Sequence, residues 1–414
     1  MGGKKKYDGY RAYDYLDPGI DFKPFNLRKA IADRWSYTVP LSPTEEDRAK
    51  DIINKSIIID LHEHPCIYPV DISQSPLLNR QGRQFTAYHA LSLSGLDGVF
   101  DNLMNGESSI ATKHGWDWMS TIHDLGMRLC DIAHQNFITP ARTVDDVVNA
   151  HRDGKLAWIA VLESASCIEN EVDRIDILYG LGVRSMGICY SESNMLGSGL
   201  KEAHDGGLTD FGYDAVVRMN KLGMLIDVSH TSDQTALDTI ESSRVPIVIS
   251  HCGARALTPI SRMFPDEVLH ALAENGGVFG VEAAPNMTVT ARHPKHSIES
   301  YMEHIEYCIE LMGIDYVGCG PDTMYGDHVN LYRAGASRSQ TEGLGQYSRD
   351  ESAKGQFLGI EMDVDSLPEY VRGMENPTEC LQNVVRWMVK HGYSDLEIQK
   401  VVGQNALRLL RESW

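Results

Sequence analysis

Six side chains of the kinds that bind metal ions stand at the ends of apolar stretches: His62, His64, Glu163, His230, His251 and Asp322. The stretches are SIIIDL, LAWIAVL, GMLIDVS, VPIVIS and YVGCGP. They are rich in β-branched residues and do not alternate between apolar and polar residues, which is typical of buried parallel strands. Because parallel strands end on one face, we expect the six side chains to converge there. This set, which lacks cysteine, suits zinc or a harder divalent ion such as manganese.

The spacing within the first motif supports this interpretation. Successive side chains of a strand point to opposite sides, so His62 and His64 can reach one metal ion. Asp60 would point the same way, one step deeper. Any single histidine after an apolar run is more often a hydrogen-bonded structural residue than a ligand. The agreement between five strand ends is what favours a metal centre.

The elements that would hold these ligands alternate between strands and helices. Helical patterns include 210–223 and 231–245, the second opened by a Ser or Thr cap. Alternation indicates a parallel sheet, and eight strands indicate its closure into a (β/α)8 TIM barrel, an α/β fold. The predicted strands are 56–61, 96–101, 157–163, 183–188, 223–229, 245–250, 277–282 and 315–320.

The chain of 414 residues fits one barrel domain, 46–414, preceded by an aromatic-rich, proline-broken extension, 1–45. We expect the extension to pack on its own domain rather than on a neighbouring subunit, since bulky aromatic residues need burial. A helix should follow, with Thr44 as its N-cap. We also expect a homo-oligomer, a dimer or larger.

Two connections are long for a barrel: 64–95 and 323–365. Both would leave the face that carries the ligands. Each is therefore a candidate lid, with surface ornament as the alternative.

Composition narrows the function. The net charge of −20 opposes binding to nucleic acid or to an anionic membrane, so a small-molecule substrate is expected. No apolar stretch follows the basic start of the chain, which predicts a cytoplasmic protein. The eight cysteines form no CxxC pair and are expected to be reduced core residues.

Several motifs together resemble the renal, or membrane, dipeptidase family of zinc peptidases, a branch of the amidohydrolase-type barrels. The resemblance extends from about residue 55 to the C-terminus. It rests on DLHEHP at 60–65, VLES at 161–164, GVRSMGICYSESNMLGSG at 182–199, GGLTDFG at 206–212, IDVSH at 226–230, VISHCGARAL at 248–257, VGCGPD at 317–322 and ENPTE at 375–379.

The resemblance implies roles for the ligands. His62 and His64 would bind one metal ion, Glu163 would bridge two, and His230 with His251 would bind the second, with two zinc ions per chain expected and manganese possible. Asp322 matches the acid beside the attacking water, so Asp322 and Glu163 are the expected catalytic residues.

The resemblance also implies substrate contacts. Arg262 matches the arginine that holds the substrate's terminal carboxylate, a task suited to a guanidinium fork. The alternative is that Arg262 only ties down its loop. Tyr190 falls where many relatives place a substrate-binding histidine, and Asn194 is expected to face the pocket.

One position departs from the family pattern. The better-known dipeptidases carry an aspartate where this chain has His64. Two divalent ions with Glu163, Asp322 and a hydroxide then sum to about plus one, rather than zero. This difference could favour an anionic substrate, weaken the first metal site or lower the pKa of the bound water.

The expected function is hydrolysis of a dipeptide or related amide by a metal-activated water, with the substrate's carboxylate held by Arg262. A hydrolase of a non-peptide amide or lactone, or a metal-assisted decarboxylase, is the alternative on the same barrel. A catalytically dead binding protein is a third hypothesis. Bound metal and metal-stimulated activity would separate it from the enzymes.

Overall fold

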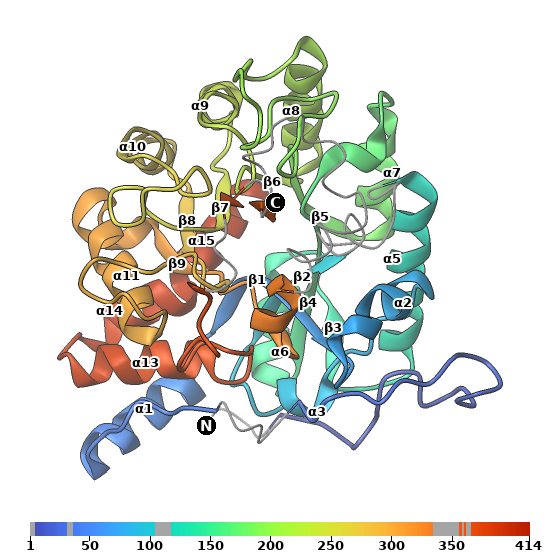
Figure 1. Cartoon of the computed structure of the whole chain (residues 1–414), viewed down its shortest axis with the longest axis vertical. Helices are drawn as coiled ribbons and strands as arrows, with labels where there is room; N and C mark the ends of the chain where they lie inside the picture. Colours follow the sequence, from blue (N-terminus) through green and yellow to red (C-terminus); the bar gives the residue numbers. More distant parts are fainter. Residues whose placement is uncertain (1–4, 31–35, 104–116, 334–355, 358–359, 362–365) are drawn as a thin grey trace.

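The computed structural model describes residues 5–30, 36–103, 117–333, 356–357, 360–361 and 366–414. Eight parallel strands form its centre and are surrounded by helices (Figure 1). Each predicted strand is present, and the (β/α)8 class is confirmed. The strands pair in the order β1 (Ile59–Ile67), β2 (Gly98–Leu103), β4 (Leu156–Leu162), β5 (Val183–Gly187), β6 (Leu225–Asp227), β7 (Val248–Cys252), β8 (Val278–Val281) and β9 (Val317–Cys319).

The last strand meets the first through the residues that follow it. The backbone N–H of Asp322 donates to the carbonyl of His62 at 3.0 Å, and that of His64 donates to the carbonyl of Thr323 at 3.0 Å. The short strand β10 (Met324–Tyr325) then pairs in parallel with β1. This pairing extends β1 beyond its predicted end and places His62, His64 and Asp322 side by side.

Helices cover the outside of the strands. They are α5 (Trp118–Ala133), α6 (Val144–Asp153), α7 (Asp173–Leu181), α8 (Asp210–Leu222), α9 (Asp233–Ser242), α10 (Asp266–Glu274), α11 (Ile298–Met312), α13 (Cys380–Lys390), α14 (Asp395–Gln399) and α15 (Asn405–Ser413). The predicted Ser or Thr cap of α9 is Ser232. A further strand, β3 (Ile138–Pro140), pairs with β4 outside the predicted set.

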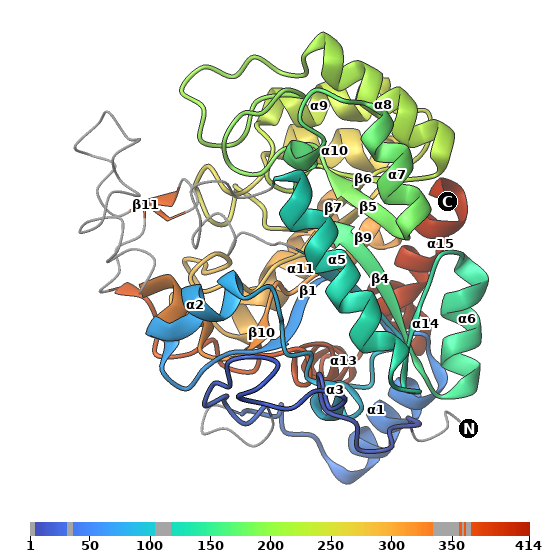
Figure 2. The same cartoon turned by 90° about the vertical axis from the view of Figure 1, so that its right-hand side faces the viewer.

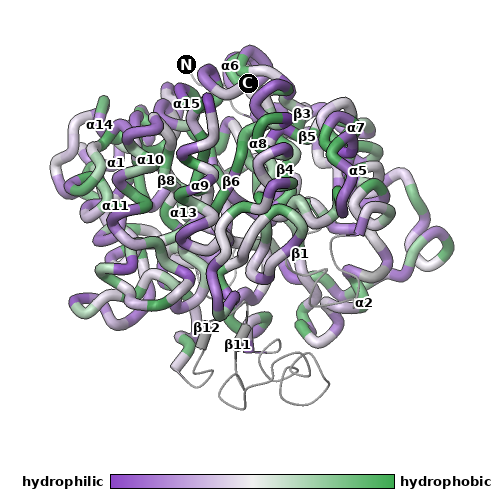
Figure 3. Tube along the Cα trace, turned by 90° about the horizontal axis from the view of Figure 1, so that it is seen from above, coloured by the Kyte–Doolittle hydropathy of each residue, from purple (hydrophilic) through white to green (hydrophobic). Residues whose placement is uncertain are grey.

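The two ends of the barrel differ. Helices α6 and α15 lie at one end, whereas α2 (Ser75–Arg80) and β11 (Gln356–Phe357) lie at the other (Figures 2 and 3). Since α6 leads into β4 and α2 follows β1, the C-terminal ends of the strands face α2. Apolar side chains fill the barrel below that end, among them Leu61, Phe100, Ile159, Val248 and Leu410. The site is thus built on a packed floor.

The helix before the barrel begins earlier than predicted. Helix α1 spans Pro43–Lys55, and its N-cap is Ser42, not Thr44. Pro43 occupies the first helical turn, where its missing N–H is not needed, and Glu45 then closes a capping box with Ser42. The prediction of Thr44 was wrong because it overlooked this proline.

The N-terminal extension packs on the barrel's own loop and helix. Asp131 of α5 is fully buried and accepts hydrogen bonds from the hydroxyl of Tyr10 at 2.6 Å and the backbone N–H of Tyr13 at 2.8 Å. It also accepts one from the hydroxyl of Tyr88, in the connection after β1, at 2.8 Å. One carboxylate therefore joins the extension, the connection and the helix. The division into 1–45 and 46–414 stays a prediction.

We expect Asp131→Ala to lower the free energy of unfolding by about 3 kcal/mol, because two buried donors and one half-buried donor lose a charged acceptor. Urea denaturation followed by circular dichroism measures this. Asp14→Ala is the matched control, since Asp14 forms only an exposed pair with Arg11 and should cost under about 0.5 kcal/mol. Equal midpoints for the two variants would show that Asp131 does not anchor the extension.

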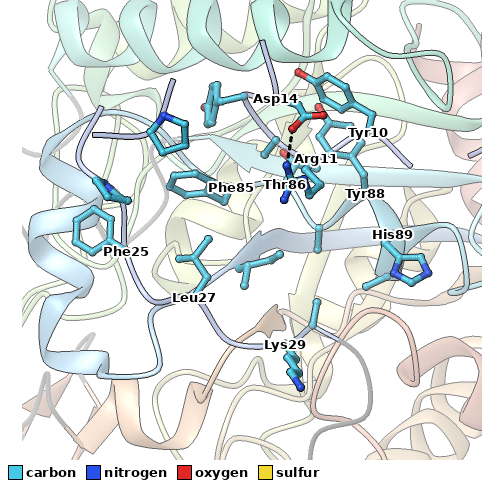
Figure 4. A pocket seen from close by; sticks show the side chains of 18 of the residues that line it. Tyr10, Arg11, Asp14, Phe25, Leu27, Lys29, Phe85, Thr86, Tyr88 and His89 are labelled. Carbon is cyan, nitrogen blue, oxygen red and sulfur yellow. Dashed lines mark hydrogen bonds and ion pairs between the residues drawn. The ribbon is translucent and has the colours of Figure 1, made fainter. Parts of the chain in front are cut away.

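A hollow of about 940 Å³ lies between the extension and the connection after β1. Figure 4 shows its aromatic wall, including Tyr10, Phe25, Phe85 and Tyr88. None of the six ligand-type residues lines it. The connection 64–95 contains short helices, of which α3 (Tyr88–Leu91) forms part of this wall. The candidate lid at 323–365 falls largely outside the described residues, at 334–355.

Within the described part of the chain, no helix is both long and apolar enough to cross a bilayer. All eight cysteines lie in this part and are free thiols. Seven are buried, as predicted, whereas Cys130 is exposed, so the expectation of a core residue was wrong there.

Candidate metal centre

One group of ligand-type residues joins the ends of β1 and β9. The Nε2 atoms of His62 and His64 lie 3.4 Å and 3.2 Å from Oδ1 of Asp322. His62 is fully buried, and the Asp322 side chain is 13% exposed. Thus the pair of imidazoles predicted from the two-residue spacing does share a carboxylate neighbour, and the three residues could hold one ion.

A second group joins β4, β6 and β7. Oε1 of Glu163 lies 3.4 Å from Nε2 of His230 and 3.5 Å from Nε2 of His251, and the two imidazole nitrogens are 2.8 Å apart. The same Oε1 lies 3.3 Å from Nε2 of His62. Glu163 therefore stands between the two groups. The structure brings together all six predicted side chains.

The backbone at Asp322 adopts a left-handed conformation, with φ of 56°. Residues other than glycine rarely adopt it, and where they do they often serve a functional site. Here the conformation turns the chain just after β9, between its hydrogen bonds to β1. It presents the carboxylate to the two histidines.

Neighbouring polar groups orient the imidazoles. The amide of Asn102, at the end of β2, lies 2.7 Å from Nδ1 of His62. Ser250 lies 2.8 Å from Nδ1 of His251 and hydrogen-bonds to buried Asp227. With Nδ1 engaged in this way, the Nε2 atoms of both rings face the centre, as they do in metal-binding histidines whose other ring nitrogen is hydrogen-bonded.

The carboxylates dominate the electrostatics of the first group. Burial lowers the pKa of His62, but Glu163 and Asp322 outweigh it and raise that pKa to about 10. Burial also lowers the pKa of His64, but Asp322, its main charged neighbour, outweighs burial and raises that pKa to about 9. Burial would raise the pKa of Asp322, yet hydrogen bonds from both histidines hold it well below its ordinary value. The two carboxylates thus attract positive charge at this point.

Burial dominates at the second group. It lowers the pKa of His230 and, more strongly, that of His251. Neutral imidazoles are the form that ligates metal ions. Two neutral ring nitrogens and a carboxylate oxygen that face one another, within 3.5 Å, form a donor set that fits a divalent cation.

Asp60 is not part of this centre. Its side chain is coupled by a hydrogen bond to Glu63, the residue between the two histidines, and one of its oxygens accepts from the backbone of His62. The pairing register of β1 shifts between Asp60 and Glu63, which breaks the alternation used for the prediction. The expectation that Asp60 points with His62 and His64 was therefore wrong.

Arg262, one of the predicted substrate-binding residues, lies beside the centre. Arg262 is 3% exposed and donates to the carbonyls of Ser229 at 2.9 Å and His251 at 2.8 Å. Its third bond, 2.8 Å long, goes to Oε2 of Glu282. The alternative role, tying down loops, thus has a structural basis, since these carbonyls belong to segments that carry ligands.

Tyr190 and Asn194 differ in what they contact. The ring of Tyr190 stacks on that of His230, with centroids 4.2 Å apart. The amide of Asn194 donates to Ser166 and to the carbonyl of Ile188, and its oxygen accepts from the backbone of Leu196. Asn194 therefore shapes its loop through these bonds, and its contact with substrate stays a prediction.

Sequence reasoning missed two residues at strand ends, Asn102 and Glu282. Glu282 follows β8 directly, and its carboxylate forms a possible ligand group with His251 and Asp322. Burial raises its pKa to about 7, although Arg262 lowers it. The signal was present, because VFGVE resembles AVLE around Glu163. Inspecting every strand end for polar residues would have found both.

The fold and the site together define a parallel α/β barrel that carries a cluster of metal-binding residues at the C-terminal ends of its strands. The chain belongs to the membrane dipeptidase family, peptidase family M19, whose model matches residues 46–331 and 351–413.

Comparisons with individual proteins agree. Dipeptidase tcpJ of Claviceps purpurea is 28% identical over 293 residues, which cover 70% of this chain and 58% of that protein. The chain thus spans somewhat over half the length of this relative. An amidohydrolase from Pseudomonas aeruginosa has the same fold, with a TM-score of 0.66, 23% identity, and coverage of 88% of this chain and 99% of its own.

A metallopeptidase from Rhodobacter sphaeroides, solved with a phosphinate mimic of the dipeptide L-Ala-D-Ala, also shares the fold. Its TM-score is 0.64 at 19% identity, and the match covers 87% of this chain and all of the other.

Proposed function

We propose that this protein is a metal-dependent hydrolase of dipeptides or closely related amides. The observation that carries the proposal is the double cluster around Glu163, in which three imidazole nitrogens lie within 3.5 Å of one carboxylate oxygen. Membership of the membrane dipeptidase family supports it. So does the phosphinate dipeptide mimic bound by a protein of the same fold.

In this proposal His62, His64 and Asp322 would hold one divalent ion, and His230 and His251 would hold the second. Glu163, which lies between the two groups, would contribute to both. We propose zinc, with manganese as the alternative, and two ions per chain, since histidine and carboxylate ligands suit both. When bound, such a centre would supply an activated water and would polarise the carbonyl under attack.

The chain's own residues do the remaining chemistry. Asp322, 13% exposed beside His62 and His64, takes the proton of the attacking water and returns it to the leaving amine. Glu163 is held between three histidines, so its oxygens are poorly placed to shuttle that proton. Tyr190 packs against His230 and forms a wall for substrate.

A panel of L-L, L-D and glycine-containing dipeptides and N-acyl amino acids tests the proposal on the metal-loaded protein. Hydrolysis of at least one dipeptide class, abolished by a chelator, is expected. Cleavage of simple lactones with no cleavage of any dipeptide would favour the alternative hydrolase. One observation favours this alternative: Glu282 already pairs with Arg262, the residue proposed to bind the substrate's carboxylate.

We expect Arg262→Ala to raise the KM of substrates with a free carboxylate far more than the KM of their amides. Loss of a buried charge pair costs on the order of 2 to 5 kcal/mol, which initial rates resolve. Arg218→Ala is the control, because Arg218 of α8 pairs with exposed Asp173 of α7, on the outside of the barrel. If the KM rose equally for acids and amides and the thermal stability fell, Arg262 would only stabilise its loop.

A further inference from the structure

The donors of Arg262 are already engaged. Its Nη2 group has two hydrogens, and the structure pairs this nitrogen with the carbonyl of His251 and with Oε2 of Glu282, both at 2.8 Å. A carboxylate can form two parallel hydrogen bonds to a guanidinium along either of two edges, Nε with Nη2 or Nη1 with Nη2. Both edges include this nitrogen. A substrate carboxylate therefore cannot bind Arg262 in a bidentate manner until one of these partners gives way.

Glu282 is the partner that can give way. The carbonyl of His251 belongs to the backbone of strand β7 and is fixed there. The carboxylate of Glu282, in contrast, is a side-chain group just after β8. Its other oxygen, Oε1, is buried and has no hydrogen-bond partner among the described residues. The carboxylate also reaches the centre, where it lies within 4.8 Å of the ligand atoms of His251 and Asp322.

The charges give this pair a consequence for substrate choice. Arg262 and Glu282 are 3% and 1% exposed, so with Glu282 ionised they form a buried and nearly neutral unit. A carboxylate that entered would place two anions on one cation in a site of low dielectric, where their repulsion is strong. An amide or ester end would meet no such repulsion.

We propose that Glu282 is a specificity-determining residue that competes with a substrate's carboxylate for Arg262. It weakens the binding of ligands with a free carboxylate relative to their uncharged analogues. This inference rests on the proposed function for the place of the substrate in the site. It adds a determinant that none of the six ligand-type residues supplies.

The test measures binding, by calorimetry, of two probes to the metal-loaded protein: a phosphinate mimic of L-Ala-D-Ala and its C-terminal carboxamide. For Glu282→Gln we expect the affinity for the acid mimic to rise roughly tenfold or more, since a buried cation then lacks its partner. The affinity for the carboxamide should stay within about twofold of the unaltered protein's. Glu375→Gln, at another buried carboxyl group, should change neither affinity.

A second readout separates specificity from structure. The acid mimic should raise the melting temperature of Glu282→Gln more than that of the unaltered protein, whereas the carboxamide should raise both equally. Should Glu282→Gln not fold, Glu282→Asp serves in its place, because its shorter carboxylate draws back from Arg262. The same direction of change is then expected.

Three results would overturn the inference. An unchanged ratio of acid to carboxamide affinity would show that Glu282 does not compete. Loss of both affinities together with bound metal would make Glu282 a ligand. Failure of the unaltered, metal-loaded protein to bind either mimic would instead remove the proposed function, and this inference with it.

Discussion

Asp322→Asn should lower turnover of a dipeptide by roughly 10² to 10⁴, the usual cost of a lost general acid or base. The amide retains an oxygen beside His62 and His64, so the metal content should remain almost unchanged. Asparagine cannot accept the proton of the attacking water. Stopped assays at saturating substrate, together with elemental analysis of the same preparation, measure both quantities.

Asp315→Asn is the matched control for this change. Asp315 lies just before β9, the strand that Asp322 follows. Its side chain is half exposed and pairs with Lys400 on the surface. Its loss should leave turnover within about twofold, since exposed pairs contribute little. If Asp322→Asn also turned over normally, proton transfer would have to be assigned elsewhere, with Asp327 and His328 as the next candidates.

Glu163→Gln should be at least as damaging, and through a different cause. The carboxylate oxygen of Glu163 lies within 3.5 Å of three imidazole nitrogens, so its negative charge serves both proposed metal sites. We expect fewer bound ions per chain and a loss of hydrolysis of roughly 10³-fold or more, since the metals supply several kcal/mol of stabilisation.

The control for this variant is Glu169→Gln, which alters an exposed acid a few residues further along the chain. It should keep its metal and its rate. Full metal content in Glu163→Gln would contradict the joining role of Glu163, even if hydrolysis were lost.

The sequence allowed the barrel and the six clustered side chains to be predicted, because both depend on local patterns. An apolar run that ends in His, Asp or Glu marks the C-terminal end of a buried strand. Where a pattern was incomplete, the prediction failed. Asp60 was misplaced by a register shift that no period-two pattern reveals, and Thr44 was chosen as a cap although Pro43 makes Ser42 the better one.

The relation between Arg262 and Glu282 shows a different limit. The two residues are twenty positions apart and lie after different strands, so only the pairing of β7 with β8 in the folded sheet brings them within 2.8 Å. The sequence could suggest that Arg262 binds a carboxylate. It could not show that the carboxylate already there belongs to the protein itself.

Metal dependence is tested most directly by measuring dipeptide hydrolysis as divalent metal is returned to the chelated, folded protein. We expect negligible hydrolysis without metal and a rate that rises with bound zinc or manganese until about two ions per chain are held. Saturation near one ion would mean that one metal site is lost because His64 stands in place of an aspartate. Full hydrolysis by the metal-free protein would show that the proposed metal centre is not what drives the reaction.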